Sequence, residues 1–283
     1  MTRSTSRLKA LKLVLTIVVG LTISVPATIQ ADVDADRAQF REFYSQRFPD
    51  VVLEDFVQGV YAIDEQLRRQ SEAVNEFPPY EFAIDEGEAI VSAPLPSGQT
   101  LLDCIGPNPV ARHPYFDNEL GKVITLGSAI NTCRTRQEQP KLSYQQQTLQ
   151  AVLGYLGVLE RGQVRRTPVP STLAAKSAYE RGKAFFYTKR GQLNLSCADC
   201  HMRAVGQHLR EQTLAPLLGV VNHFPIYSLR AGALGSLHQR FVGCVEQVRG
   251  ESPSLESQQF RELEYFLSLM ADGLPIIGPS TQR

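Results

Sequence analysis

A run of five residues limits what this chain can be: Cys197-Ala198-Asp199-Cys200-His201. Two cysteines three positions apart, followed at once by a histidine, form the attachment motif of a c-type haem. Cys197 and Cys200 would form thioethers to one porphyrin, and His201 would be the proximal ligand of its iron. A redox dithiol or half of a zinc site is the alternative, but neither a nearby Cys/His cluster nor a strand–helix–strand pattern accompanies the motif. The sequence therefore predicts one covalently bound haem c.

The first 31 residues have the pattern of an export signal. An apolar segment, residues 13–25, is too short to span a bilayer and is followed by small residues, with Ala27 and Ala31 as candidate cleavage positions. An uncleaved membrane anchor is the alternative. We therefore expect cleavage near Ala31 and a periplasmic mature protein. The basic residues that precede the apolar segment are Arg3, Arg7, Lys9 and Lys12.

The charge of the mature chain excludes some classes of partner. Cleavage would remove four basic and no acidic residues from a chain with 29 of each, leaving a net charge of −4. This balance argues against nucleic acid and anionic membrane surfaces as partners. No later stretch is long and apolar enough to span a bilayer.

Apolar spacing predicts a mainly α-helical chain with few strands. Residues 80–97 differ, since acidic residues and a short apolar run suggest an exposed arm or an edge strand. Residues 216–235 look irregular and would wrap the haem edge, and a helix is expected to start near Thr125. Helical periodicity covers residues 33–75, 145–159, 172–189 and 252–271.

Residues 162–170 contain two prolines and read as a linker. We place a domain boundary there, between residues 32–165 and the haem-bearing residues 166–283. In cytochromes c the first and last helices cross through a glycine and an aromatic residue. Gly182 and either Tyr265 or Phe266 are suited to that contact.

Three cysteines remain beside the haem pair. In an oxidising compartment two of them are expected to pair and one to be left over. Cys104 and Cys133 bracket one loop-rich segment and form the natural disulfide, with free thiols at both sites as the alternative. Cys244 is then the odd cysteine.

The haem iron also needs a sixth ligand. Met270 lies on the packing face of the last helix, where we expect it to fill the core. Cys244 is a plausible distal ligand, and Arg240, four residues earlier, would share its helical face and stabilise a thiolate. A thiolate is both a haem ligand and a sulfur nucleophile. The remaining candidates, each also readable as a surface or loop residue, are His208, His223 and His238.

Two stretches of the sequence resemble the SoxA family, the haem-bearing subunits of the SoxAX cytochromes of sulfur-oxidising bacteria. Residues 187–196 (YTKRGQLNLS) precede the haem motif, and residues 232–240 (GALGSLHQR) lead into Cys244. The likeness is most specific over residues 174–274 and extends more weakly to residues 115–117 and 121–133.

The resemblance implies a structure and a site. It implies two cytochrome c-like domains, the N-terminal one lacking haem and having Cys104 and Cys133 as a disulfide. It also implies His201 and Cys244 as axial ligands of one haem, with Cys244 commonly modified to a persulfide. Arg240 matches the arginine that borders the active site and attracts thiosulfate.

The resemblance further implies an L-cysteine S-thiosulfotransferase. Thiosulfate would be conjugated oxidatively to a cysteine of the SoxYZ carrier, with electrons leaving through haem, in a heterodimer with a SoxX-type cytochrome c. Two other functions stay open: a simple periplasmic electron-transfer cytochrome c, or a binding subunit whose haem is structural and whose residues 32–165 dock partners.

Overall fold

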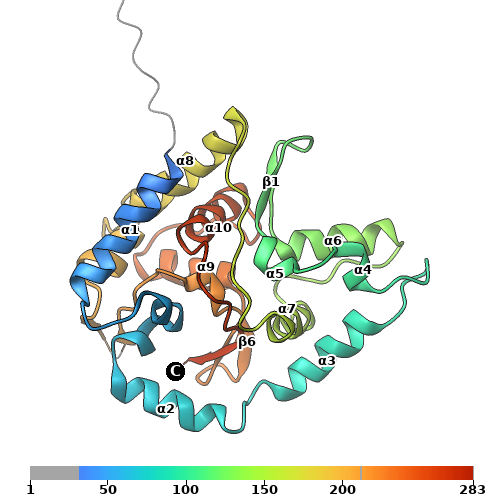
Figure 1. Cartoon of the computed structure of the whole chain (residues 1–283), viewed down its shortest axis with the longest axis horizontal. Coiled ribbons are helices and arrows are strands. Elements are labelled where there is room, and N and C mark those ends of the chain that lie inside the picture. Colours follow the sequence, from blue (N-terminus) through green and yellow to red (C-terminus); the bar gives the residue numbers. More distant parts are fainter. Residues whose placement is uncertain (1–31, 211, 283) are drawn as a thin grey trace, which may run out of the picture. The chain divides into compact units, whose positions relative to one another are not determined.

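Helices make up most of the fold, as the apolar spacing predicted, and the computed structural model describes them over residues 32–210 and 212–282 (Figure 1). The predicted export signal, residues 1–31, lies outside the described residues. The earlier elements are α1 (Val33–Arg47), η1 (Leu53–Ala62), α2 (Glu65–Asn75), α3 (Glu81–Ser92), α4 (Leu101–Ile105), α5 (Pro109–Arg112), β1 (Tyr115–Asp117), β2 (Lys122–Ile124), α6 (Leu126–Arg136) and α7 (Gln147–Leu159). The later ones are α8 (Leu173–Tyr187), η2 (Asp199–Arg203), β3 (His208–Leu209), β4 (Gln212–Thr213), η3 (Val220–Asn222), β5 (Ile226–Ser228), β6 (Ala233–Gly235), α9 (Leu237–Gln247), α10 (Gln258–Met270) and β7 (Ser280–Gln282).

Most of the predicted helices are confirmed, with shifted ends. Residues 33–75 form three helices, and α6 begins at its predicted cap, where the Thr125 side chain accepts a hydrogen bond from Ser128 N. The last helix starts six residues later than expected, at Gln258 after the cap Ser257. The delay has a local cause, because Glu256 has a positive φ that an α-helix does not accommodate.

The prediction of an arm or edge strand for residues 80–97 is wrong, because most of this segment forms α3. Ile84, Gly87 and Val91 recur at helical spacing and lie on the face that packs on α7, while the acidic residues between them point outward. The short apolar run at residues 89–91 is divided between two faces of α3, since Ala89 is exposed and Val91 is buried.

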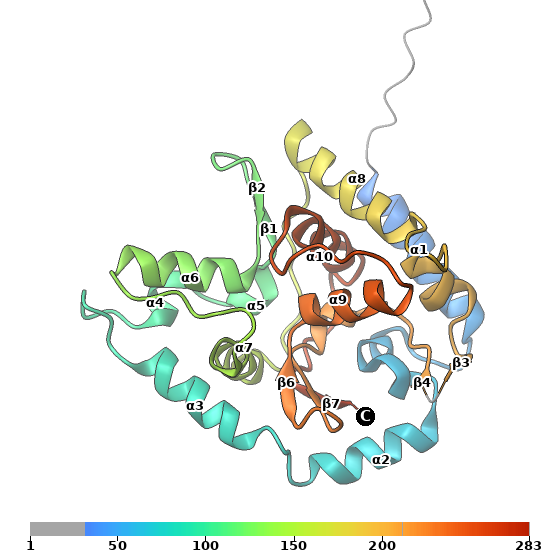
Figure 2. The ribbon, with the colours of Figure 1, turned by 180° about the vertical axis from the view of Figure 1, so that it is seen from behind.

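Residues 216–235 are more regular than predicted. They include η3 and a hairpin in which β5 pairs antiparallel with β6. The C-terminal strand β7 adds to the other side of β5 in parallel, giving the strand order β6-β5-β7 (Figure 2).

The two halves of the chain, the first up to α7 and the second from α8 onward, repeat one arrangement of strands and helices. A hairpin, a capped helix and a longer helix follow each other as β1, β2, α6 and α7, and again as β5, β6, α9 and α10, with identical spacing. The same interval separates Thr125 from Ser236, the two helix caps, and Cys133 from Cys244. Cys244 therefore occupies the position in the second half that Cys133 occupies in the first.

Each half also contains one close crossing of helices at a glycine. A Cβ on Gly182 of α8 would collide with the carbonyl oxygen of Glu262 in α10, and one on Gly87 of α3 with that of Ala151 in α7. Gly182 was predicted, but it meets the α10 backbone. The ring of Phe266 instead contacts Tyr179 and Phe186 of α8, with ring centroids 5.7 and 5.5 Å apart.

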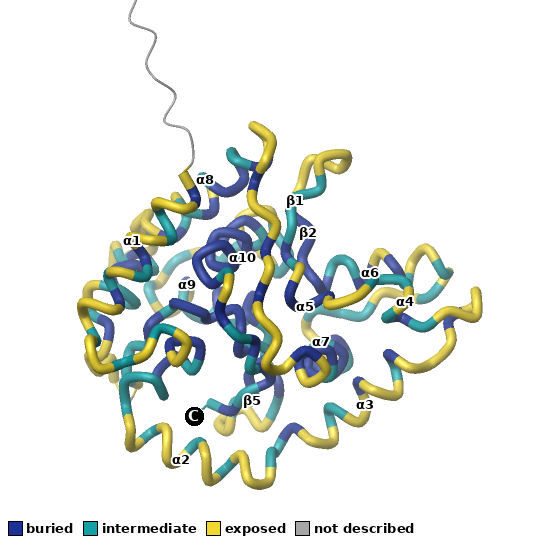
Figure 3. Tube along the Cα trace, viewed as in Figure 1, coloured by how far each residue is buried: buried dark blue, intermediate teal, exposed yellow. Residues whose placement is uncertain are grey.

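Two hydrophobic cores lie beneath these crossings, and α10 and α7 are buried in them (Figure 3). One is built by α3, α4, α6 and α7. The other, around α8 and α10, also takes Phe40 and Tyr44 of α1 and Phe56 of η1, so the N-terminal helix packs with the haem motif. The domain boundary stays a prediction.

The predicted linker is held in place. Arg165 N donates to Leu274 O at 3.0 Å, and Ile276 N donates to Gln163 O at 2.8 Å, so residues 163–165 run beside residues 274–276.

Among the described residues, none of the helices has both the length and the apolar character that crossing a membrane requires.

The glycine crossings generate a first prediction. Replacing Gly182 or Gly87 by alanine should lower the free energy of unfolding by about 1–3 kcal/mol, because the added methyl group forces helix backbones apart. Gly243 in α9 is the control, since nothing lies within 4 Å of a Cβ there, and Gly243→Ala should be neutral or stabilising by up to about 1 kcal/mol. Urea unfolding of all three measures this, and equal effects would contradict the crossing.

Candidate functional site

One cavity of about 220 Å³ brings together the five residues that the sequence placed in the haem and sulfur site: Cys197, Cys200, His201, Arg240 and Cys244. They come from the turn after α8 and from α9. Much of the remaining wall is apolar, including Phe185, Phe186, Leu217, Val220, Phe241, Leu263 and Leu267. An apolar cavity with a few converging polar groups is typical of a cofactor site.

A tight loop between α8 and the haem motif is fixed against the end of α9. Gly191 has a φ of +69°, and a Cβ there would collide with Val248 O. Leu193 N donates to Val248 O at 3.2 Å, which joins the loop to the helix that carries Cys244. The motif then begins with a reciprocal cap, because Ser196 N donates to Asp199 Oδ2 at 2.8 Å and Asp199 N donates to Ser196 Oγ at 3.1 Å. These bonds from Ser196 lower the pKa of Asp199.

His201 is oriented through its other ring nitrogen. Its Nδ1 lies 2.8 Å from the carbonyl oxygen of Ala215, which can only accept, so Nδ1 carries the proton and Nε2 keeps its lone pair. Such a bond commonly fixes the tautomer and ring orientation of a metal-bound histidine. Burial lowers the pKa of His201, which favours the neutral ring that ligation requires.

Tyr44 of α1 anchors the backbone of the same motif and was not singled out as a site residue from the sequence. Its hydroxyl donates to His201 O at 2.8 Å and accepts from Leu217 N at 3.2 Å, and the side chain is fully buried. No local signal in the sequence connects Tyr44 to a motif 157 residues away.

The two motif cysteines are unpaired thiols in the cavity wall. Arg190 Nη1 lies 3.7 Å from Cys197 Sγ, and the guanidinium carbon lies 3.7 Å from the centre of the Phe185 ring. Burial raises the pKa of both cysteines. Among residues 32–210 and 212–282, no three His, Cys, Asp or Glu side chains are placed to hold a metal ion, which removes support for the zinc alternative.

Cys244 and Arg240 lie one turn apart on α9, which begins with a capping box formed by Ser236 and Gln239. Arg240 Nη2 donates to Gln282 Oε1 at 2.6 Å. Burial raises the pKa of Cys244 to about 11, and the charge of Arg240 opposes that rise. The arginine therefore lowers the pKa of the thiol, as expected, but burial raises this pKa by more.

The other side chains that the sequence offered as sixth ligand of the haem iron lie in different parts of the fold. Met270 is buried in the core, as expected, and does not line the cavity. His208 is exposed in the β3–β4 hairpin. His223 does line the cavity, but its Nδ1 lies 2.6 Å from Val57 O, and burial lowers its pKa to about 4. Cys244 and His223 are thus the two distal candidates on the cavity wall.

The expected disulfide is present between Cys104 and Cys133, with Cα atoms 6.1 Å apart. It joins α4 to α6 in the core of the first half. Cys244 is left as the unpaired cysteine outside the haem motif.

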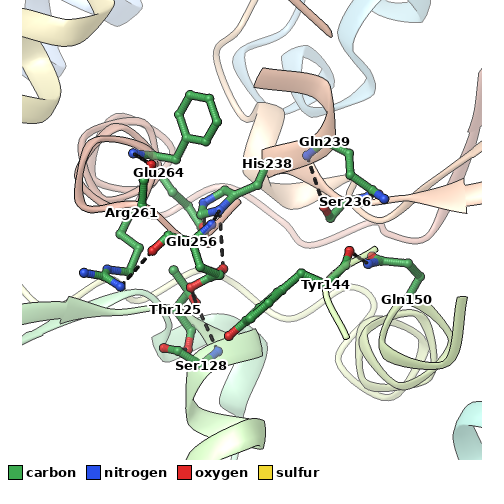
Figure 4. A network of polar contacts seen from close by, with 12 residues as sticks. Thr125, Ser128, Tyr144, Gln150, Ser236, His238, Gln239, Glu256, Arg261 and Glu264 are labelled. Atoms are coloured by element: carbon green, nitrogen blue, oxygen red, sulfur yellow. Dashed lines mark hydrogen bonds and ion pairs between the residues drawn. The ribbon is translucent and has the colours of Figure 1, made fainter. Parts of the chain in front are cut away.

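His238 belongs to a separate buried network where the two halves meet (Figure 4). Its Nε2 lies 2.9 Å from Glu264 Oε2, and its Nδ1 lies 3.3 Å from Glu256 Oε1. Glu256 Oε2 also accepts from the hydroxyl of Thr125, the cap of α6, at 2.8 Å. Burial lowers the pKa of His238, but the bond to Glu264 and the charges of both glutamates outweigh it, so this pKa is raised.

Comparison with known proteins agrees with this geometry. The profile of the SoxA/TsdA cytochrome c domain matches residues 86–164 and 181–276, which contain the repeated elements of the two halves. The chain is therefore a cytochrome c-domain protein.

Curated relatives narrow the class. The SoxA subunit of L-cysteine S-thiosulfotransferase from Allochromatium vinosum is 39% identical over 94% of this chain and 96% of its own length. The corresponding subunit from Chlorobaculum tepidum is 40% identical over 90% of this chain and 89% of its own length. The crystal structure of SoxXA from P. pantotrophus matches with a TM-score of 0.67 and 26% identity, covering 76% of this chain and 84% of that one. The chain belongs to the SoxA family.

Tyr44 provides a second prediction. Tyr44→Phe should lower the free energy of unfolding by about 1–3 kcal/mol, because His201 O and Leu217 N both lose a buried partner. Tyr155→Phe is the matched control, since that hydroxyl makes only a long exposed bond of 3.4 Å to Glu88. Urea unfolding compares the two, and a Tyr44→Phe effect as small as that of the control would show that the anchor adds nothing.

The His238 network gives a pH-dependent prediction. A raised pKa in the folded state stabilises the fold below the unfolded value of about 6.5, and this contribution is lost as pH rises through the folded pKa. The stability difference between the native protein and His238→Gln should therefore shrink as the pH rises above about 6.5. His208→Gln, on the exposed hairpin, controls for loss of an imidazole, and a difference that grows with pH would reverse the assigned sign.

Proposed function

We propose that this chain is the haem c subunit of a thiosulfate-oxidising SoxAX-type complex, an L-cysteine S-thiosulfotransferase. One observation carries the proposal: a single cavity combines the Cys-x-x-Cys-His motif with an unpaired cysteine and an arginine. The activity printed for the relatives that align over nearly the whole chain supports the same function.

The residues present fit a covalently bound haem c. Cys197 and Cys200 are free to form thioethers, and the contact of His201 Nδ1 with Ala215 O leaves the Nε2 lone pair for an iron ion. We propose Cys244 as the distal ligand, and His223 is the alternative. When bound, the haem supplies a one-electron acceptor beside the reacting sulfur.

The reaction that we propose is a two-electron oxidation. A carrier thiol and thiosulfate form one sulfur–sulfur bond, giving a cysteine S-thiosulfonate, and the thiol proton and two electrons leave. Since one haem accepts one electron, the two electrons would leave one at a time, and the haem c of the SoxX-type partner would accept the second. Arg240 would attract the thiosulfate dianion into the cavity, because a guanidinium binds oxyanions through several donors in one plane. Cys244 would supply a sulfur able to exchange, as a persulfide, next to the electron acceptor.

The two halves of the chain would then have different roles. We propose that residues 166–283 carry the haem and that residues 32–165 include a cytochrome c-like domain without haem. The repeated helix crossing supports this, since Gly87 and Gly182 make equivalent contacts. In the first half the Cys104–Cys133 disulfide takes up the cysteine that corresponds to Cys244.

The cellular location and the partners follow from the same proposed function. The chain would act in the periplasm after cleavage near Ala31, with a SoxX-type cytochrome c as its partner subunit and the SoxYZ carrier as its protein substrate. The likeness to the SoxXA structure supports the first of these partners.

Removing Cys244 tests the function. The haem-loaded Cys244→Ala protein should keep one covalent haem by intact mass, but lose thiosulfate conjugation to the carrier by a factor of about 100 or more. The double variant Cys104→Ser/Cys133→Ser is the control, because that disulfide lies in the other core and should not alter turnover of the folded protein.

Intact mass of the native protein before and after a mild thiol adds a second readout. One extra sulfur atom that is lost on reduction identifies a persulfide at Cys244. Full conjugation activity in Cys244→Ala would show that Cys244 is not the exchanging sulfur, absence of conjugation by the native protein would favour a simple electron-transfer cytochrome, and absence of covalent haem would overturn the assignment.

A further inference from the structure

The C-terminal strand forms part of the cavity wall. β7 pairs in parallel with β5, with Ile226 opposite Ser280 and Ser228 opposite Gln282. All three residues of β7 line the cavity that contains Arg240 and Cys244. The last residues that the structure describes are therefore within reach of the proposed substrate.

This strand is fixed by bonds on both sides. Leu229 N donates to Gln282 O at 2.8 Å, and Tyr61 OH donates to Thr281 O at 2.8 Å. The Thr281 hydroxyl donates to Asn75 Oδ1 at 3.1 Å. Bonds from β5 and η1 thus hold the backbone of β7, a bond to α2 holds the Thr281 side chain, and the Gln282 side chain starts from a defined position.

The amide of Gln282 holds Arg240. Its Oε1 accepts a hydrogen bond of 2.6 Å from Arg240 Nη2, across 42 residues of sequence. A neutral amide orients a guanidinium without cancelling its charge, whereas a carboxylate in that place would form an ion pair. Within residues 32–210 and 212–282, no carboxylate lies within 4.0 Å of the Arg240 guanidinium.

We propose that Gln282 is a positioning residue for the anion-binding arginine of the reaction: it aims the Arg240 guanidinium into the cavity and leaves its full positive charge for thiosulfate. This inference rests on the proposed function. Since Gln282 occupies only Nη2, the remaining guanidinium donors stay available to the oxygen atoms of a divalent sulfur oxyanion.

Two isosteric variants separate orientation from charge. Gln282→Glu keeps an acceptor but introduces a negative charge, and Gln282→Met keeps the shape but removes the acceptor. We expect the calorimetric dissociation constant of thiosulfate for the haem-loaded protein to rise about tenfold in Gln282→Glu, the scale of one partly screened charge interaction, and about threefold in Gln282→Met. In turnover with the partner and the carrier, KM for thiosulfate should rise by similar factors while kcat changes little.

A double-mutant cycle shows whether the effect passes through Arg240. In an Arg240→Ala background, Gln282→Glu should change thiosulfate binding by less than twofold, because no guanidinium remains to be neutralised. An undiminished tenfold effect in that background would mean that the new carboxylate simply repels the anion, and would overturn the inference.

Two further outcomes distinguish this inference from the proposed function. If Arg240→Ala weakens thiosulfate binding but both Gln282 variants bind it as the native protein does, Gln282 does not position the arginine. If Arg240→Ala itself leaves binding unchanged, the anion site lies elsewhere and the inference fails with it, although the Cys244→Ala test of the function still stands. Thermal unfolding and haem absorbance per chain confirm that each variant is folded and loaded.

Discussion

Two helix backbones can touch only where no side chain stands between them, and Gly182 provides that point between α8 and α10. The contact sets the distance between the helices whose residues form much of the apolar cavity wall, with Phe185 and Phe186 on one and Leu263 and Leu267 on the other. α8 then leads directly into the haem motif. The width of the cavity therefore depends on a single missing methyl group, and the same solution recurs at Gly87 in the first half.

Local patterns in the sequence predicted much of this fold. The cap at Thr125, the disulfide and most helices depend on residues close together in the chain or on simple redox chemistry, and they were predicted correctly. The segment at residues 80–97 was misread because its apolar positions make sense only against α7, which lies more than 50 residues further on. The resemblance implied two similar domains, but the equivalence of Cys133 and Cys244 was not predicted, because it follows from the spacing of elements whose bounds only the structure gives.

Site residues with distinctive side-chain chemistry could be predicted from the sequence. Site residues whose role depends on a contact made only in the fold were missed. Cysteine, histidine and arginine at short spacing pointed to Cys197, Cys200, His201, Arg240 and Cys244, and the structure places all five on one cavity. Tyr44 and Gln282 have ordinary side chains. They matter only because α1 lies against the motif and the C-terminus returns beside β5, and neither arrangement is encoded in a short sequence pattern.

Three unpaired thiols share one enclosed space in this fold, those of Cys197, Cys200 and Cys244. In an oxidising compartment such a set is a hazard during biogenesis, because any two thiols that meet can close into a disulfide and consume the attachment motif. Under the proposed function, thioether bonds to porphyrin would remove the first two from that competition. Covalent attachment of haem would then also protect Cys244, because an attached motif cysteine can no longer form a disulfide with it.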